Sequence, residues 1–552
     1  MALLDQFRLG NLQRVRRISH AMGMLAALLP AAALAGEALT FVGFDEDSHS
    51  ADAHEGMQEI FSGRCFHNGM PVTALKAMSA ARAQSHTDLG YDPDSPEGTY
   101  YSTAKIPSPP ERQSELALGE SVFEREGAQL TNGNCFSCHA GIVNGQVVAG
   151  LGNNRRVPPN RSRRGGPGMI ELLSLLNAAE KKAFAVTMAS ALALNLSLPE
   201  TPSRGDNFGP FAVWSVGARL ADPAKTGLLV SDEKTELTEL IASTMVPTVD
   251  PMPWWLMKYK KRDYWYADGG IYDASHFSFN FTTSHSEVND NHAAHVDSTA
   301  KALAFARETQ SPLFPTELDA ARVKQGADLF HGRVRPTQKR GFIACKTCHG
   351  TYTRKASQSD LSKPGSWDVS YKGSATLKNV KTDATYNAVL QKFKPIVDHI
   401  NKLATYYEAQ GTPELTPTVS VPSRKGYVAP PLVGVWASAP YFHNGSVPTI
   451  ATVLNSKERP KIWSRNISDP HGYDLEHVGL QHEPMTRAQY DASATEAAEA
   501  HPRSKAMIDH QSIYDTGSYG HGNMGHTFGD RLTTEERAAV IEFLKSLSGP
   551  DM

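Results

Sequence analysis

The chain has 552 residues, which is enough for roughly two to four domains. Its formal net charge is −3 at pH 7, and this slightly acidic balance argues against a nucleic-acid-binding protein. The rest of the composition is that of ordinary globular proteins, so the motifs must indicate the function.

The N-terminus has the pattern of a secretory signal peptide. Four arginines precede an apolar run at 22–34, and Ala33-Leu34-Ala35 offers the small residues of a cleavage site. We expect residues 1–35 to be removed on export, which lowers the net charge to −6 because four Arg and one Asp are lost. The run is short and contains Pro30, so we expect no permanent membrane span, with a retained anchor as the alternative. The expected location is the periplasm or the cell exterior.

The next segment, 36–110, is rich in acidic residues, Ser and Pro, and we expect an irregular N-terminal arm. Cys65 in this arm is either a buried thiol or an exposed reactive one. The apolar pattern at 114–126 predicts a helix that leads into the first of two motifs.

Both motifs have the form C-x-x-C-H, the attachment signature of c-type haem. Two thiols one helical turn apart can bond to the two vinyl groups of one porphyrin, and the adjacent His can reach the iron. The residues are Cys135, Cys138 and His139 in the first motif, and Cys345, Cys348 and His349 in the second. A zinc site built from the two cysteine pairs is the alternative, but zinc gives no reason for both histidines. A redox-active C-x-x-C is a further alternative. We predict two covalently bound haem c groups.

Each motif follows a similar apolar sequence, Gly119–Phe123 in one case and Gly326–Phe330 in the other. We interpret this echo as an internal repeat in which a helix leads through a loop into the haem motif. A long apolar pattern at 169–198 predicts a core helix, with a wall of a substrate pocket as the alternative.

A basic loop follows the first motif and could pair with haem propionates or simply be solvated. Its arginines are Arg155, Arg156, Arg161, Arg163 and Arg164. Further on, Trp254 and Trp255 begin an aromatic cluster interleaved with lysines. Three roles are open for these two tryptophans: a relay for electrons between haems, an aromatic wall for an apolar substrate, or core packing.

The sequence at 311–315 has the composition of a linker between a first haem domain, 111–315, and a second, 316–552. Thr316 with Asp319 is expected to cap the following helix. Near the end of the chain, Thr533 and Glu536 form a capping box before an apolar stripe. We expect a mainly α fold of two cytochrome-c-like haem domains with long loop-rich insertions.

Residues 426–450 carry a family resemblance. Their core at 439–446, Ala-Pro-Tyr-Phe-His-Asn-Gly-Ser, resembles the bacterial dihaem cytochrome c peroxidase superfamily. With the two haem motifs, the resemblance covers roughly residue 115 to the end. The chain length and the sequences at 435–440, 458–461 and 254–261 look most like the branch of rubber oxygenases and fatty-acid dioxygenases.

One position departs from the peroxidases, in which a Met placed fourteen residues after the motif His ligates the electron-transfer haem. Here that position is Lys457, which cannot be a ligand while protonated. The oxygenase branch implies a second His ligand near the C-terminus, and His526 is the matching candidate, with His521 as the runner-up.

The resemblance implies an oxygenase that uses O2 at the haem on His139 to attack an apolar unsaturated substrate. Trp254 and Trp255 are the candidate catalytic residues, and the haem held by His349 and His526 would feed electrons. The alternatives are a cytochrome c peroxidase, with hydrogen peroxide and a small redox cytochrome as partners, and a non-catalytic electron-transfer protein. A calcium ion between the domains occurs in relatives, but no ligand set for it is visible here.

Overall fold

The computed structural model describes residues 39–63, 69–78, 106–153, 169–197, 236–259, 292–398 and 426–549, apart from short gaps inside these ranges. Its α-helices are α2 (Ala51–Ser62), α5 (Phe136–His139), α6 (Met169–Leu175), α7 (Ala178–Ser197), α11 (His292–Glu308), α12 (Ala320–Phe330), α13 (Lys346–His349), α14 (Thr385–Lys392), α16 (Ile450–Leu454), α17 (Arg487–Glu499), α18 (Lys505–Gln511) and α19 (Thr534–Ser546). The 3-10 helices used below are η3 (Trp254–Tyr259), η7 (Val435–Ala437), η8 (Ser456–Glu458) and η9 (Thr527–Arg531).

Short strands alternate with these helices. They are β1 (Thr40–Val42), β2 (Met70–Pro71), β3 (Glu120–Arg125), β4 (Ala128–Gly133), β5 (Ala140–Val143), β6 (Gln146–Ala149), β7 (Thr351–Arg354), β8 (Trp367–Ser370), β9 (Leu377–Lys378), β10 (Tyr427–Val428), β11 (Ile462–Ser464), β12 (Tyr473–Asp474), β13 (Gly479–Leu480), β14 (Glu483–Pro484) and β15 (Tyr514–Asp515). They form sheets of two or three strands, among them β1-β6-β5 and β2-β4-β3 around the first motif. The described part is therefore more mixed than the mainly α fold expected from the sequence.

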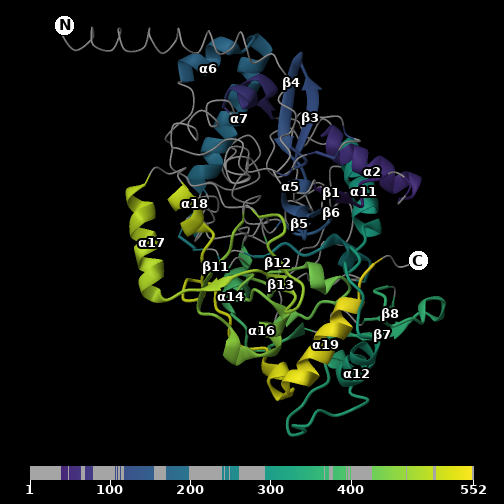
Figure 1. Ribbon diagram of the computed structural model, residues 1–552. Helices are drawn as coiled ribbons and strands as arrows, with labels where there is room; N and C mark the ends of the chain where they lie inside the picture. The colour runs from purple at the N-terminus through teal and green to yellow at the C-terminus, as the bar shows by residue number, and fades with distance from the viewer. Residues whose placement is uncertain are drawn as a thin grey trace.

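Two groups of elements are visible in Figure 1. Strands β1 to β6 gather with α2 and α11 in the upper part of the view, and α12, α16 and α19 gather in the lower part. There are two main apolar cores: one surrounds Phe136 in the first haem motif, and the other contains Phe330 and Phe543 near the second and extends to Val143 and Val148 of the upper group. Burial of these cores provides most of the driving force for folding.

The N-terminal arm contains a helix that the sequence analysis did not predict. In α2, Ala53, Met57 and Ile60 recur at helical spacing and are buried. Ser50 caps the helix, and its hydroxyl also donates to a carboxylate oxygen of Glu308 at the end of α11, at 2.6 Å. The arm is thereby packed against α11 beside the first motif.

The helix predicted at 114–126 is wrong, because residues 120–125 form strand β3. A two-residue turn at Glu126-Gly127, with φ of 47° and 78°, connects β3 to β4 in an antiparallel hairpin. Ser121 and Phe123 are buried while Glu124 is exposed, so the residues follow the alternation of a strand rather than the helical period. The interpretation of an internal repeat fails with it, since a helix precedes only the second motif.

The helices of the second half follow the sequence more closely. The capping box of Thr533 and Glu536 is confirmed at the start of α19. The N-cap of α12 is Asp319, which accepts from Ala321 and Arg322, so the expectation that Thr316 begins this cap is wrong. Gly326 allows α12 to approach α19 closely, because a Cβ there would overlap the Ala539 carbonyl.

Residues 311–315, which we expected to form a linker, instead pack against residues of the second half of the chain. The Trp436 indole donates to the Pro312 carbonyl at 3.0 Å, and the backbone N–H of Phe314 donates to the Ser548 hydroxyl at 3.2 Å. The long helical pattern at 169–198 is confirmed as α6 and α7, with a break between them. Among the described residues, no helix is long and apolar enough to span a membrane.

Candidate haem-binding sites

The first C-x-x-C-H motif is held by backbone and asparagine hydrogen bonds. The N–H groups of Cys138 and His139 both bond to the Cys135 carbonyl, so the two thiols and the imidazole share one helical turn. Asn134 accepts from the Phe136 N–H at 2.9 Å and donates to the Leu118 carbonyl at 3.1 Å. These contacts hold the spacing that covalent haem attachment requires.

His139 lies in an aromatic environment. Its ring stacks on the indole of Trp254, with ring centres 4.9 Å apart and an angle of 26° between planes. Trp254 is only 3% exposed and also contacts Phe136 and Phe305. Burial lowers the pKa of His139 to about 4, against the opposing effect of the Met252 carbonyl. A neutral imidazole is the form that ligates a metal.

Trp254 and Trp255 belong to different cores although they are neighbours in sequence. Trp254 packs in the core around Phe136, whereas Trp255 is fully buried in the core of the second half. The Trp255 indole donates to the Val433 carbonyl at 2.9 Å. The start of η3 is therefore a direct connection between the surroundings of the two motifs.

In the second motif, the orientation of the histidine is fixed by a single carbonyl. The Nδ1 atom of His349 lies 2.8 Å from the Pro430 carbonyl oxygen. When Nδ1 donates to this carbonyl, Nε2 is the nitrogen left to coordinate a metal, as in most protein sites with His ligands. Burial also lowers the pKa of His349 and so favours the neutral ring.

His526 faces His349, and the distance between them fits an intervening iron. The ring centres are 6.1 Å apart, with 68° between planes. Bonds of about 2 Å to one metal, plus roughly 1.2 Å from each nitrogen to its ring centre, predict a separation of about 6.4 Å. Burial, His349 and Arg459 together lower the pKa of His526 to about 3. The residues present therefore fit a haem c with two imidazole ligands, and the assignment of His526 as the second ligand stays a prediction.

His526 has a positive φ of 45°, a backbone conformation that costs a non-Gly residue about 1–3 kcal/mol. Arg459 holds the segment in place. Its buried guanidinium donates to the carbonyls of Thr452, Val453, Asn523, Gly525 and His526. The His526 N–H donates to the Val380 carbonyl at 2.9 Å, so the ring is supported from two sides.

The motif at 439–446 supports the same loop. The Asn444 side chain donates to the Gly520 and Gly522 carbonyls at 2.9 and 3.0 Å, and Ser446 donates to the Gly522 carbonyl at 3.2 Å. The Phe442 ring lies 5.9 Å from the His526 ring. Sequence reasoning found this motif and the Glu-Arg-Pro-Lys stretch only as family signatures, and it missed that Asn444 and Arg459 position the ligand loop.

The runner-up ligand His521 lies elsewhere, as do His443 and Lys457, which the sequence does not indicate as ligands. His521 is fully buried and stacks on Tyr514 with ring centres 4.7 Å apart. His443 stacks on Tyr427 at 3.9 Å, and burial lowers the pKa of His443 to about 4. Lys457 is exposed on η8. The geometry thus favours His526 over the runner-up His521.

The two cysteine pairs lie in separate parts of the protein, Cys135 against the first core and Cys345 against the second. None of the four motif cysteines forms a disulfide. Within the described residues, no group of three or more His, Cys, Asp or Glu is arranged to hold a metal ion. This arrangement disfavours the alternative of one zinc site shared by both pairs.

Several predicted features lie outside the described residues, and the structure does not place them. They are Cys65, the arginines at 155–164, the aromatic residues at 264–266 and the C-terminal half of the lysine cluster at 258–261.

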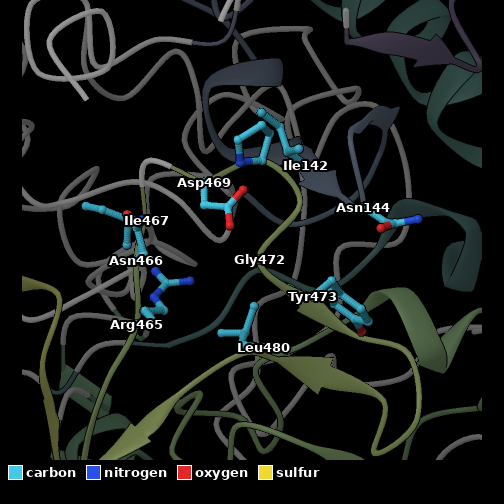
Figure 2. A pocket seen from close by; sticks show the side chains of 10 residues that line it. Ile142, Asn144, Arg465, Asn466, Ile467, Asp469, Gly472, Tyr473 and Leu480 are labelled. Carbon is cyan, nitrogen blue, oxygen red and sulfur yellow. The ribbon is translucent and has the colours of Figure 1, made fainter. Parts of the chain in front are cut away.

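A small pocket lies where the two halves meet (Figure 2). It encloses about 330 Å³, part of it open to solvent, between the β5–β6 hairpin and the segment 465–473. Its lining combines Asn144, Arg465 and Asp469 with the apolar Ile142 and Leu480. The Gly145 N–H donates to the Pro470 carbonyl at 2.9 Å beside it. The pocket contains no motif residue, so it belongs to the contact between the halves rather than to a haem site.

Comparison with known proteins agrees with this geometry. Residues 426–464 match the family model described as RoxA-like, cytochrome c-like. These residues include Pro430, the 439–446 motif and Arg459. The protein therefore carries a c-type cytochrome domain, which implies covalently bound haem c and an oxidoreductase. Within that class the domain is RoxA-like, so the expected similarity to the rubber oxygenase branch is confirmed over this segment.

Two curated relatives come from Sinorhizobium fredii (strain NBRC 101917 / NGR234). The uncharacterized protein y4iM is 36% identical over 108 residues, which are 19% of this chain and 21% of the relative. The uncharacterized protein y4iJ is 32% identical over 132 residues, 22% of this chain and 18% of the relative. The matched segments thus span about a fifth of each relative's length.

Proposed function

We propose that the protein is an exported dihaem c-type cytochrome that acts as an oxygenase on an apolar unsaturated substrate, with O2 as co-substrate. The observation that carries the proposal is the 6.1 Å separation of His349 and His526. His349 and His526 would together hold the second haem and leave no iron position for O2, so the reaction is assigned to the haem that His139 would hold. The RoxA-like match at 426–464 supports the oxygenase chemistry.

At the first site, Cys135, Cys138 and His139 would hold the haem, which when bound supplies the activation of O2. The protein keeps the His139 imidazole neutral by burial and orients it through the stacked Trp254. Trp254 stacks on His139, the residue that would ligate the iron, and so would lie on that residue's side of the haem. This position suits a relay better than a wall of the substrate cavity, which would lie across the haem.

The second site would hold its haem through Cys345, Cys348 and His349, with His526 on the opposite face. Trp254 and Trp255, which we call the tryptophan bridge, link this site to the first, because the Trp255 indole donates to the Val433 carbonyl. We assign the second haem to electron storage and transfer, and the first to the substrate. The signal pattern and the extracytoplasmic attachment of haem c support a periplasmic or secreted location.

An oxygen electrode tests this function directly. Protein with both haems loaded and reduced once should consume O2 in the presence of polyisoprene or an unsaturated fatty acid, without further reductant. The uptake should stop with the corresponding saturated substrate. Absence of O2 uptake with every unsaturated substrate would contradict the proposal.

A cytochrome c peroxidase is the second candidate, because the tryptophan bridge also suits a peroxide-reducing site fed by the second haem. Peroxide-dependent oxidation of a reduced small c-type cytochrome distinguishes the two functions. Rapid turnover in this assay, with no O2 uptake in the first, would make the peroxidase the better description. Neither turnover nor O2 uptake would favour an electron-transfer protein without catalysis.

A further inference from the structure

The segment between α12 and α13 surrounds the second haem motif with positive charge. Between residues 329 and 359 there are seven Lys or Arg and no Asp or Glu, in a chain of net charge −3. Five of these cations precede the motif or lie within it, and all five are exposed: Arg333, Arg335, Lys339, Arg340 and Lys346. In Figure 1 the chain leaving α12 forms the lower edge of the molecule.

Contacts to α12 and α19 hold this basic segment in shape. The Thr337 N–H and hydroxyl both donate to one carboxylate oxygen of Glu536, each at 2.8 Å. Phe342 packs against the core of the second half. Of the cations, Arg333 pairs with Asp328 at 3.2 Å, whereas Arg335 and Arg340 make no ion pair with a described carboxylate. Their charge is therefore directed to solvent.

Two apolar side chains are exposed among the cations. Val334 is 53% exposed and Ile343 is 47% exposed, and Ile343 lies two residues before Cys345. Single exposed apolar side chains are common on protein surfaces, but these two stand in the same short chain segment as the five exposed cations. The arrangement combines long-range attraction with a small apolar contact next to the haem attachment point.

We propose that this basic segment, 333–346, is the docking site for a small one-electron redox protein with an acidic surface. The inference rests on the second haem of the proposed function. The partner is oxidised by one electron and the second haem is reduced by that electron, with no bond made and no proton moved. An oxygenase needs such an electron once, to prime its iron, whereas a peroxidase needs it in each turnover.

Charge complementarity identifies the partner's chemistry. Redox partners form small, transient interfaces, and opposite charges raise their association rate at low ionic strength. The attraction weakens as salt is added because exposed charges are screened over about 10 Å at 0.1 M ionic strength. The segment runs directly into the haem motif, which favours a redox protein over a lipid surface, because a lipid surface would gain nothing from that position.

The test measures binding as well as electron transfer. A plant-type [2Fe–2S] ferredoxin serves as the acidic probe, and a basic mitochondrial-type cytochrome c serves as the probe of opposite charge. Surface plasmon resonance gives Kd at low and high salt, and stopped-flow absorption gives the rate of reduction of the second haem. The variant pair R335E/R340E should weaken ferredoxin binding at least tenfold, and R335K/R340K should retain it.

The matched control K181E/K182E reverses the charge of two exposed lysines of the first half and should leave the Kd for ferredoxin unchanged. Equal Kd for R335E/R340E and wild type, or tighter binding of the basic cytochrome than of ferredoxin, would overturn the proposal. The proposal would also be overturned if R335E/R340E no longer bound phosphatidylglycerol vesicles but still bound ferredoxin. None of these measurements needs O2 or an organic substrate, so failure of docking and failure of the oxygenase function are distinguishable.

Discussion

The two C-x-x-C-H motifs have identical spacing but opposite surroundings. The first sits beside a β-hairpin, and its histidine stacks on Trp254 within a cage of buried aromatic rings. The second follows an exposed basic segment, and its histidine faces His526. The attachment chemistry is thus the same at both sites, and the surrounding fold decides what each site can do. The first is set among apolar groups, and the second, as proposed, would be closed on both faces by histidines and reachable by a charged partner.

The contrast between the two sites is tested most directly by replacing His526, the candidate ligand that would close the second site. H526A should open one face of the second haem and convert it from six-coordinate low-spin to high-spin, with the first haem unchanged. Visible absorption and electron paramagnetic resonance of the loaded protein measure this change. H521A should leave the spin state unaltered even if stability falls, since His521 stacks on Tyr514. A low-spin second haem in H526A would show that His526 is not its ligand.

Replacing the bridge residue nearest the first site should slow transfer between the haems. W254F is expected to lower the rate at least tenfold, because the indole that contacts His139 is lost while the ring volume is largely kept. In stopped-flow absorption the second haem is reduced first, and the rate is that at which its electron then passes on, which reoxidises the second haem and reduces the first. W436F is the matched control, since Trp436 is equally buried and its indole bonds to the Pro312 carbonyl at 3.0 Å. Equal slowing in W254F and W436F would mean that Trp254 serves core packing and is not an electron relay.

The support of the second site can be weakened without touching its ligands. R459K should destabilise the protein by about 3 kcal/mol, because several buried carbonyls lose a charged donor. Part of the second haem should also become high-spin. Urea unfolding and the absorption spectrum measure both effects. R322K, in an exposed pair with Asp319, should cost less than about 1 kcal/mol and leave the spectrum unchanged. A normal spectrum in R459K would mean that the guanidinium only stabilises the fold.

Acid should destabilise the half that carries the 439–446 motif. His443 has a pKa of about 4 in the folded protein and near 6.5 when unfolded, so the unfolded chain binds the extra proton as pH falls below 6.5. Its contribution is fully present above pH 6.5 and is lost between pH 6.5 and 4. H443Q should reduce the dependence of unfolding free energy on pH by about 1 kcal/mol per pH unit in this range. An unchanged slope would contradict this assignment.

The sequence predicted the features that depend on local pattern. The capping box at Thr533 follows from a short spacing and is confirmed. The haem motifs follow from a spacing and His526 from the family resemblance, and their roles stay predictions. The β3–β4 hairpin was missed because Glu126-Gly127 was not recognised as a two-residue turn, although a Gly after a polar residue is a hairpin signal. The positions of Trp254 and Arg459 depend on long-range packing, and no local period encodes which carbonyls or rings they meet.

The division of one short turn between two cores has a consequence for evolution. Trp254 and Trp255 are adjacent in the chain, yet they are buried in two different apolar cores. Recombination that exchanged one haem module near residue 315 would separate Trp255 from its hydrogen-bond acceptor, the Val433 carbonyl. We therefore expect natural or designed chimaeras to remain functional only when η3 and the segment around Val433 are inherited together.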